Sequence, residues 1–354
     1  MSGSDKPLLS ICCLGYCHAG YLSDAIQSIS DIGYDNVEVI VVDDGSTDDS
    51  VVLLNTLSET VSFKMTVIAQ ENTGNIGLNF NTAFKAAQGD LVIFLSLDDV
   101  FNPVCMRQQV EMMTLNADLA FVASSKTVSI DNEGYVTEKA SQLPLHQKDS
   151  PDIDMLLELE YSEFGSFFIQ SAVFRKAVID AVGGFDDDMT GDDIVLRTKV
   201  FRYLKSEARY SFAILKQNSF FYRLHGSNVH RNFPRQIKTV TEYLDRYWLG
   251  RSNPPMLIDW ACSYISDHPF DDYVSVFSLN GRAASLLKEP DVQAAIRSAL
   301  EKEVSFKNKV ANWIYRRAKM DGGKRRITLF GFIRFEYKRA AKSNAFLHYS
   351  EYKA

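Results

Sequence analysis

The chain has 354 residues, of which 46% are hydrophobic and 23% charged, and its formal net charge is −7. This composition is typical of a globular protein, and no apolar run reaches the roughly 18 residues that a predicted transmembrane helix needs. The five cysteines are an odd, unevenly spread set, which argues against a disulfide framework and favours the reducing cytoplasm. The polar residues 1–9 lack the apolar stretch of a secretory signal, so we expect a cytoplasmic protein.

The first half of the chain alternates predicted strands and helices. Apolar runs predict strands, and amphipathic or capped segments predict helices between them. The expected strands are 8–14, 37–42, 63–69 and 91–95, and the expected helices are 18–30, 49–57 and 81–87. This alternation indicates right-handed crossovers and a mostly parallel sheet. Cys12 and Cys13 fall in the first strand and point to opposite faces, which disfavours a zinc site with Cys17.

The second half of the chain begins in the same way and then changes. We expect helices at 104–114, at 175–182 and from about 192, a strand at 119–124, and short strands at 212–215 and 219–222. Residues 125–152 are polar and irregular, as in a substrate-facing loop. From about 239 the pattern becomes helical, and the breakers at 250–255 indicate a boundary nearby. The sequence therefore predicts a domain at 1–240 and a mainly helical region at 241–354.

Four polar clusters lie at the ends of predicted strands or the start of a helix: Asp43-Asp44, Asp98-Asp99, Asp192-Asp193 and the segment 223–228. Each has a simple alternative: a turn with a helix cap, a helix start that complements the dipole, or a solvated loop histidine. Asp98-Asp99 is the most informative cluster, because it follows the all-apolar run at 91–95 that is typical of a covered parallel strand. Open α/β sheets bind ligands at the carboxyl ends of such strands, and a divalent cation with a phosphate would relieve the repulsion between the two acids.

Six motifs in these regions resemble those of the inverting family-2 glycosyltransferases. The family's second strand ends in V-V-D-D-G-S-T-D, which this chain repeats at 41–48. The others read S-I-C-C-L-G-Y-C at 10–17, N-T-G-N-I-G at 72–77, F-L-S-L-D-D at 94–99 with Pro103, G-G-F-D at 183–186 and Y-R-L-H-G-S-N at 222–228. All six stand in the family's order.

The resemblance implies the α/β nucleotide-sugar-binding fold called GT-A, with a mostly parallel central sheet flanked by helices. It also implies a metal-dependent inverting transferase that moves a sugar from a nucleotide sugar, a UDP-sugar being favoured, to a hydroxyl of a glycan or lipid-linked acceptor. Many bacterial relatives modify polyprenyl-linked glycans at the inner membrane face. We therefore expect a role in bacterial surface polysaccharide synthesis, such as that of O-antigen or capsule.

The resemblance also assigns donor-binding residues. The implied set is Tyr16, Asp44, Gly45, Asn72, Gly74, Gly77, Asn81, Ser96, Leu97 and Asp98. Tyr16 would stack on the base, and Asp44 would accept a hydrogen bond from an imide N–H of uracil or from guanine. The glycine-rich turn at 72–77 would bring backbone amides close to the ligand.

The implied chemistry uses four further assignments. Asp98 matches the last carboxylate of the family's D-x-D motif and, with His225, would hold Mn²⁺ or Mg²⁺ against the diphosphate. Asp193, beside Asp192, would take the proton from the acceptor hydroxyl. Ser96 stands where the family usually has the first acid of D-x-D, and could bond the ribose or weaken metal binding. Leu14, Gly15 and Cys17 replace the usual Pro, Thr and Asn beside the base pocket, which leaves the identity of the base open.

The C-terminal region carries a separate signal. Residues 301–345 hold thirteen Lys or Arg against four Asp or Glu, a net charge of +9, and the basic segment 302–342 mixes these cations with aromatic residues around 324–335. We expect helices at 272–287, 292–303 and 306–317, and possible contacts of the basic segment are an anionic membrane surface, an oligomer interface or solvent alone. No recognised motif accompanies the charge, so nucleic-acid binding is not expected.

Two alternative functions stay open at this point. A nucleotidyltransferase on a similar fold would usually carry a glycine-rich loop with a cation after the first strand, and residues 14–20 have none. A catalytically degenerate nucleotide-sugar or glycan-binding protein is conceivable because of Ser96. A signalling receiver domain is disfavoured, because it would be about 120 residues long and would leave Asp193 and His225 unused.

Overall fold

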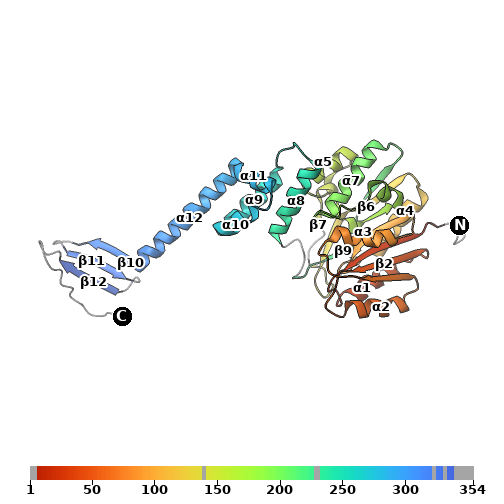
Figure 1. The fold of residues 1–354 in the computed structure, drawn as a ribbon, viewed down its shortest axis with the longest axis horizontal. Helices are drawn as coiled ribbons and strands as arrows, with labels where there is room; N and C mark the ends of the chain where they lie inside the picture. Colours follow the sequence, from red (N-terminus) through yellow and green to blue (C-terminus); the bar gives the residue numbers. More distant parts are fainter. Residues whose placement is uncertain (1–5, 138–140, 227–231, 321–323, 330–332, 339–354) are drawn as a thin grey trace. The chain divides into compact units, whose positions relative to one another are not determined.

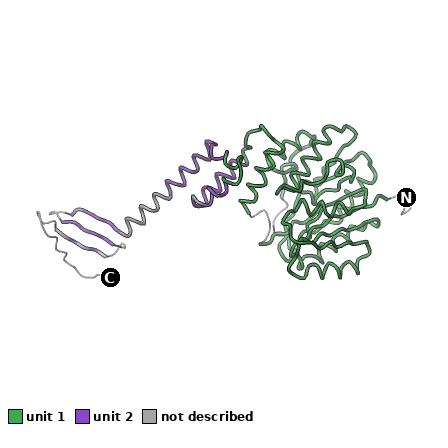
Figure 2. The backbone as a smooth tube through the Cα atoms, viewed as in Figure 1, with its two compact units in different colours: residues 1–256, 278–284 green, residues 257–277, 285–354 purple. Residues whose placement is uncertain are grey.

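The computed structural model describes residues 6–137, 141–226, 232–320, 324–329 and 333–338. The chain divides into two compact units (Figure 2): unit 1 comprises residues 1–256 and 278–284, and unit 2 comprises residues 257–277 and 285–354. Helix α8 (Phe233–Tyr247) passes through residue 240 inside unit 1. The domain division 1–240 and 241–354 stays a prediction, while every motif described above lies in unit 1.

Unit 1 is built on a sheet in the order β3-β2-β1-β4-β8-β6-β9-β5, with β7 paired to β6. Its strands are β1 (Leu9–Gly15), β2 (Val37–Asp43), β3 (Lys64–Ala69), β4 (Leu91–Ser96), β5 (Val100–Phe101), β6 (Leu119–Ile130), β7 (Ser141–Gln142), β8 (Ala172–Arg175) and β9 (Ser211–Arg223). Strands β1 to β4 pair in parallel, β6 and β9 pair in parallel, and β8 runs antiparallel between the two groups. The predicted mostly parallel sheet is therefore confirmed.

Helices cover both faces of this sheet (Figure 1). One apolar core packs beneath α1 (Leu22–Asp31), α2 (Ser50–Thr60) and α4 (Pro103–Leu115). The other packs beneath α3 (Ile76–Ala86), α5 (Ile153–Ser162), α6 (Lys176–Val182) and α7 (Asp193–Ser206). Side chains alternate between the two faces along β1, so Cys12 lies in the core beneath α3 and Cys13 in the core beneath α1.

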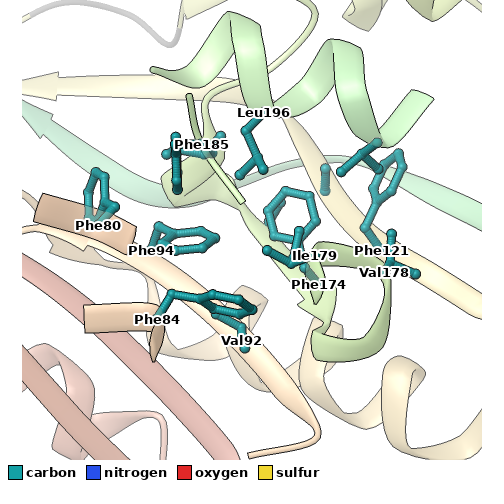
Figure 3. Packing of buried hydrophobic residues seen from close by; sticks show 14 of the residues in the cluster. Phe80, Phe84, Val92, Phe94, Phe121, Phe174, Val178, Ile179, Phe185 and Leu196 are labelled. Carbon is teal, nitrogen blue, oxygen red and sulfur yellow. The ribbon is translucent and has the colours of Figure 1, made fainter. Parts of the chain in front are cut away.

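Aromatic packing fixes the strand that leads to the acidic pair. Phe94 of β4 lies among Phe80, Phe174 and Phe185 (Figure 3), with ring centroids 5.4 Å from Phe80 and 5.1 Å from Phe185. Such pairs add about 0.5–1.5 kcal/mol each beyond the burial of their area. This packing therefore fixes the end of β4, which is Ser96, and the segment with Asp98 that follows it.

Three expectations for unit 1 are wrong in detail. The helix expected from residue 18 begins at Leu22, because residues 16–20 form a loop that the β2–α2 turn holds by hydrogen bonds. The two short strands expected at 212–215 and 219–222 are one strand, β9, since β6 continues to Ile130 and pairs with it through irregularities in register. The polar stretch expected at 125–152 accordingly contains the end of β6, strand β7 and a short 3₁₀ helix, η1 (Pro144–Gln147).

The C-terminal region contains strands that the sequence interpretation did not expect. It begins as predicted with helices, α9 (Pro255–Asp267), α10 (Phe270–Phe277), α11 (Gly281–Ser285) and α12 (Pro290–Ile314). The helix expected at 306–317 is wrong beyond residue 314: β10 (Tyr315–Lys319), β11 (Lys324–Leu329) and β12 (Ile333–Lys338) form an antiparallel sheet. Each strand pairs with its neighbour in sequence, so this sheet needs no partner from a distant part of the chain.

Candidate active site

Three side chains from distant segments meet at the carboxyl end of β4. They are Asp98, His225 from the segment after β9, and His18 from the loop after β1, and one ligand atom of each lies within 4.8 Å of the others. The Nε2 atom of His225 lies 2.9 Å from Asp98 Oδ2, and Nε2 of His18 lies 4.0 Å from the same oxygen. Asp98 and His225, predicted as a metal-binding pair, are therefore in contact, and His18 was not anticipated.

The Asp98 carboxylate is prepared for the charged form. Its burial acts to raise its pKa, but the hydrogen bond with His225, the His18 imidazole and a hydrogen bond from Ser96 Oγ outweigh this effect, and the pKa of Asp98 lies below its ordinary value. Burial lowers the pKa of His18, which favours the neutral imidazole that can ligate a metal. The predicted Ser96 thus orients Asp98 in this structure.

Arg223 and Asp99 hold this corner together from behind. The fully buried Arg223 donates from Nε to the Asp98 carbonyl at 2.8 Å, and its backbone N–H donates to Asp99 Oδ1 at 2.9 Å. Burial and the neighbouring Asp98 raise the pKa of Asp99 well above its usual range. Asp99 therefore ties the end of β9, and with it His225, to the end of β4, as a structural neighbour of the predicted metal-binding pair.

The β2–α2 turn sets the path of the loop that carries Tyr16 and His18. Two motif side chains and Ser50, the first residue of α2, accept backbone hydrogen bonds from that loop: Cys17 N–H donates to Ser46 Oγ at 2.7 Å, His18 N–H to Ser50 Oγ at 3.0 Å and Ala19 N–H to Asp48 Oδ2 at 3.1 Å. Tyr16 is 48% exposed, so its ring is available to a ligand. The V-V-D-D-G-S-T-D motif therefore forms the β2–α2 turn and also fixes the loop after β1.

Asp44 and the turn at 72–77 form a closed unit. The Asp44 carboxylate accepts hydrogen bonds from Thr73 N–H at 2.8 Å and Gly74 N–H at 3.0 Å, and it is only 5% exposed. Gly45 has φ +74°, and a Cβ there would lie 2.6 Å from the Asn72 nitrogen, so only glycine lets this turn approach. Base recognition by Asp44 stays a prediction, because this structure has its carboxylate bound to the turn.

Three other predicted donor-binding residues are used inside the protein. The Asn81 amide accepts from Phe185 N–H at 2.9 Å and donates to Phe185 O and Asp187 Oδ1, which joins α3 to the 184–187 segment. Leu97 is fully buried in the core, so only its backbone could contact a ligand. Gly77 is buried, and a Cβ there would lie 3.2 Å from Phe185 Cβ, so it serves the packing of α3.

Asp193 lies at the first turn of α7, and among the described residues one of its oxygens accepts hydrogen bonds while the other has no hydrogen-bond partner. Its Oδ2 accepts from Ile169 N–H at 3.1 Å and from Arg197 Nη1 at 3.3 Å. Asp192, the N-cap of α7, accepts from Asp193 N–H at 2.7 Å. The Asp193 side chain is 22% exposed, so its second oxygen can reach a substrate.

A buried ion pair supports Asp193. Arg197 donates from Nε and Nη2 to the two oxygens of Glu160 at 2.8 and 3.1 Å, and the two side chains are 3% and 0% exposed. Burial, followed by the charge of Asp192, raises the pKa of Asp193 to about 7, while Arg197 acts in the opposite direction. This places the titration of Asp193 near physiological pH, where a general base works best.

Sequence reasoning missed His18, Glu160 and Arg197. His18 lies two residues after Tyr16 in a recognised motif, and this proximity was the available signal. Glu160 and Arg197 lie within helices, where charged residues ordinarily face solvent, and nothing local marks them as buried.

A cavity of about 560 Å³ lies beside this region in unit 1. It is bounded by the turn at 73–75, the segment 187–190 and the start of α8, and Arg235 and Lys238 supply its positive charge. Its lining does not include Asp98 or Asp193. The cavity therefore borders the predicted nucleotide turn on the side toward α8.

Comparison with known proteins agrees with this geometry. Residues 10–183 match the sequence profile of Glycosyl transferase family 2. An uncharacterized glycosyltransferase of Nostoc sp. is 29% identical over 226 residues, 63% of this chain and 66% of that protein. One of Rickettsia prowazekii is 28% identical over 187 residues, 52% of this chain and 55% of that protein. The chain thus spans less than two thirds of the length of these relatives.

Two solved structures share the fold at low sequence identity. Residues 1–349 of S. aureus TarS, in complex with UDP-GlcNAc, superpose with a TM-score of 0.51 at 14% identity, covering 91% of this chain and 97% of that one. The mannosyltransferase PcManGT from Pyrobaculum calidifontis, in complex with GDP-Man and Mn²⁺, also gives 0.51 at 14% identity, covering 86% and 89%. The predicted GT-A fold is confirmed. With the motifs on this fold and the profile match, residues 10–183 form a Glycosyl transferase family 2 domain.

Proposed function

We propose that this protein transfers a sugar from a nucleotide sugar to a hydroxyl group of an acceptor, with inversion at the anomeric carbon. One observation carries the proposal. The pair Asp98–His225 lies at the carboxyl edge of the sheet, Asp193 lies at the start of the adjoining helix α7, and each group is in a form suited to its role. The bond from the acceptor oxygen to the anomeric carbon forms as the bond from that carbon to the diphosphate breaks. Attack from the side opposite the leaving group inverts the carbon.

Asp193 is the proposed general base. Its Oδ2 is anchored by Ile169 and Arg197, and the acceptor proton goes to its other oxygen. Asp192 fixes the start of α7 and raises the pKa of its neighbour. Because the base removes the proton directly from the acceptor, no covalent enzyme intermediate is required.

The residues present fit a divalent cation. Asp98 and His225 supply a carboxylate and an imidazole, and the buried Nδ1 of His18 makes no hydrogen bond within the described part of the chain. A Mn²⁺ or Mg²⁺ ion, when bound, would stabilise the negative charge that develops on the diphosphate. PcManGT, on the same fold, binds Mn²⁺ with its donor, which supports a metal here.

The donor is proposed to be a UDP-sugar. Tyr16 offers an exposed ring to the base, and Asp44 stands beside the turn at 72–77. TarS binds UDP-GlcNAc, while PcManGT binds GDP-Man, so the comparison supports a nucleotide sugar in general. The nucleotide preference follows from the motif resemblance alone.

A panel of nucleotides tests this proposal. We expect UDP or a UDP-sugar with Mn²⁺ to raise the unfolding temperature, because a ligand that binds only the folded protein stabilises it by about 2.7 kcal/mol at 100 times its Kd. Thermal shift with UDP, UDP-sugars, GDP, CDP and ATP, each with Mn²⁺ or EDTA, is the measurement. A shift with ATP alone would favour the alternative nucleotidyltransferase. Sugar-nucleotide binding without any release of nucleoside diphosphate would favour the degenerate binding protein.

The pH dependence of turnover should report Asp193. The carboxylate must be ionised to accept a proton, and its pKa is raised to about 7, so we expect kcat/KM to rise as pH increases through about 7 and then to level off. The measurement is release of nucleoside diphosphate from the donor that the panel identifies, with donor affinity followed over the same range as a control. A profile that stays flat through pH 7 would contradict the assignment.

The acceptor is proposed to belong to bacterial surface polysaccharide synthesis, as a glycan or polyprenyl-linked saccharide. The B. subtilis relative TuaG, whose assigned name refers to teichuronic acid biosynthesis, supports this: it is 32% identical over 112 residues, 32% of this chain and 44% of TuaG. Every helix in the described ranges is too short or too polar to cross a bilayer.

We also propose, from the charge of the basic segment, that contact with a membrane surface uses the sheet β10–β12. The exposed Arg316 and Arg334 belong to this sheet. We expect the double change Arg316→Glu and Arg334→Glu to reduce co-flotation with vesicles of anionic lipid, because each cation near such a surface contributes about 1 kcal/mol. Lys205→Glu on α7 is the control. Unchanged co-flotation of the double variant would reject membrane contact through this sheet.

A further inference from the structure

We propose that His18 is a third protein ligand of the cation, so that this protein holds its metal with two imidazoles and one carboxylate. The inference rests on the proposed function, since it names a ligand for the metal which that function uses. It also assigns a role to a residue outside the motif positions that suggested Asp98 and His225.

Ser96 creates the need for another ligand. It stands where the family pattern has a carboxylate, and its hydroxyl donates a hydrogen bond to Asp98 Oδ1. A neutral hydroxyl engaged in this way does not supply the charge of a carboxylate. The protein would otherwise offer only Asp98 and His225, and two ligands rarely hold a divalent cation firmly.

His18 is fixed in the right place before any metal binds. Its own N–H and those of both neighbours are bonded to the β2–α2 turn, and Cys17 has φ +54°, a left-handed conformation that turns the chain between Tyr16 and His18. Non-glycine residues held in this conformation cluster at functional sites. The centroid of the His18 ring lies 6.2 Å from that of the His225 ring. Asp98 Oδ2 lies 4.0 Å from His18 Nε2 and 2.9 Å from His225 Nε2.

The buried Nδ1 of His18 is an independent observation. Among the described residues it makes no hydrogen bond, and a buried polar atom without a partner is unfavourable. The ring nitrogen near the carboxylate is Nε2, 4.0 Å from Asp98 Oδ2, so a cation between the two imidazoles and Asp98 would be bound by Nε2 of His18. The three ligand atoms, all within 4.8 Å of one another, are spaced closely enough to share one ion.

This ligand set determines which cation the protein prefers. Mg²⁺ favours oxygen ligands in strict octahedral geometry, whereas imidazole suits Mn²⁺, Co²⁺ and Zn²⁺. Replacing a carboxylate by a second imidazole also removes one negative charge from the site. We therefore expect binding of Mn²⁺ and Co²⁺ in the absence of donor, and much weaker binding of Mg²⁺.

Titration of the full chain with Mn²⁺ alone, followed by the EPR signal of the free ion, tests the inference without any turnover. His18→Ala should weaken Mn²⁺ binding about tenfold or more, since even the loss of a residue that only hydrogen-bonds to a metal ligand costs about 10- to 100-fold in affinity. His268→Ala removes an exposed histidine that follows the end of α9 and should leave the affinity within about twofold of wild type. His18→Gln keeps the size of the side chain and should also weaken binding, and unfolding of each variant in EDTA verifies the fold.

A second variant makes the inference sharper. Adding Ser96→Asp to His18→Ala should recover Mn²⁺ binding and bring Mg²⁺ binding closer to it, because a carboxylate pair replaces the second imidazole. Wild-type affinity in a folded His18→Ala, with loss in Asp98→Ala, would overturn the role of His18 and leave the proposed function intact. Failure of the wild-type chain to bind Mn²⁺, with or without UDP, would overturn both.

Discussion

Asp193→Asn should remove sugar transfer and leave donor binding unchanged. We expect kcat to fall about 10²- to 10⁴-fold, the usual contribution of one positioned base. The amide is close to the carboxylate in shape, and its oxygen can still accept from Ile169 N–H and Arg197, as Asp193 Oδ2 does. Its other end is an NH₂ group, which cannot take the proton. Nucleoside diphosphate release gives kcat, and calorimetric titration with the nucleotide gives the binding constant.

Two matched variants decide what a loss of activity means. Asp180→Asn alters an exposed acid of α6 that pairs with Lys176, and it should keep both kcat and affinity. Asp192→Asn keeps an acceptor for Asp193 N–H and should lose less activity than Asp193→Asn. Wild-type turnover by Asp193→Asn would end its assignment as the base, and loss confined to Asp192→Asn would transfer that role to Asp192.

The strand ends that carry the motifs were predictable from the sequence because their signals are local. An all-apolar run followed by Asp98-Asp99, or by Asp43-Asp44, identifies a buried parallel strand and its functional end. The contact between Asp98 and His225 joins residues 127 positions apart, and only the motif resemblance could bring them together in advance. His18 directly follows the motif at 10–17 but has no role in it, so its place at the site required the three-dimensional structure.

The parts of the fold that were missed depend on partners far along the chain. Strand β8 has only four residues and acquires its identity by pairing with β4 on one side and β6 on the other. The basic residues 315–338 were interpreted by charge, yet alternation such as Arg326-Ile327-Thr328-Leu329 and the intervening Asp321-Gly322-Gly323 are typical of a hairpin. Residues 321–323 themselves lie outside the described residues.

Arg197→Met should destabilise unit 1 strongly and also alter the base. The change leaves the Glu160 carboxylate buried without its cation, and breaking one side of a buried ion pair typically costs about 3–5 kcal/mol. The hydrogen bonds from Ser166 to Glu160 remain and offset part of this cost. Removing Arg197 also removes the positive charge that opposes the rise of the Asp193 pKa, so the rising limb of the pH profile should move to higher pH. Urea unfolding and the pH dependence of kcat/KM measure the two effects.

The controls separate burial from charge. Lys205→Met breaks an exposed ion pair with Asp154 between the same two helices, α7 and α5, and should cost no more than about 1 kcal/mol. Glu160→Gln combined with Arg197→Met removes both charges and should regain part of the lost stability. The pH profile should stay shifted, though less than in Arg197→Met alone, because Glu160 raises the pKa of Asp193 by less than Arg197 lowers it. If the double variant regained stability and also regained the wild-type pH profile, Arg197 would serve the fold alone. A shifted profile in a restabilised protein would instead mean that the buried pair tunes the base.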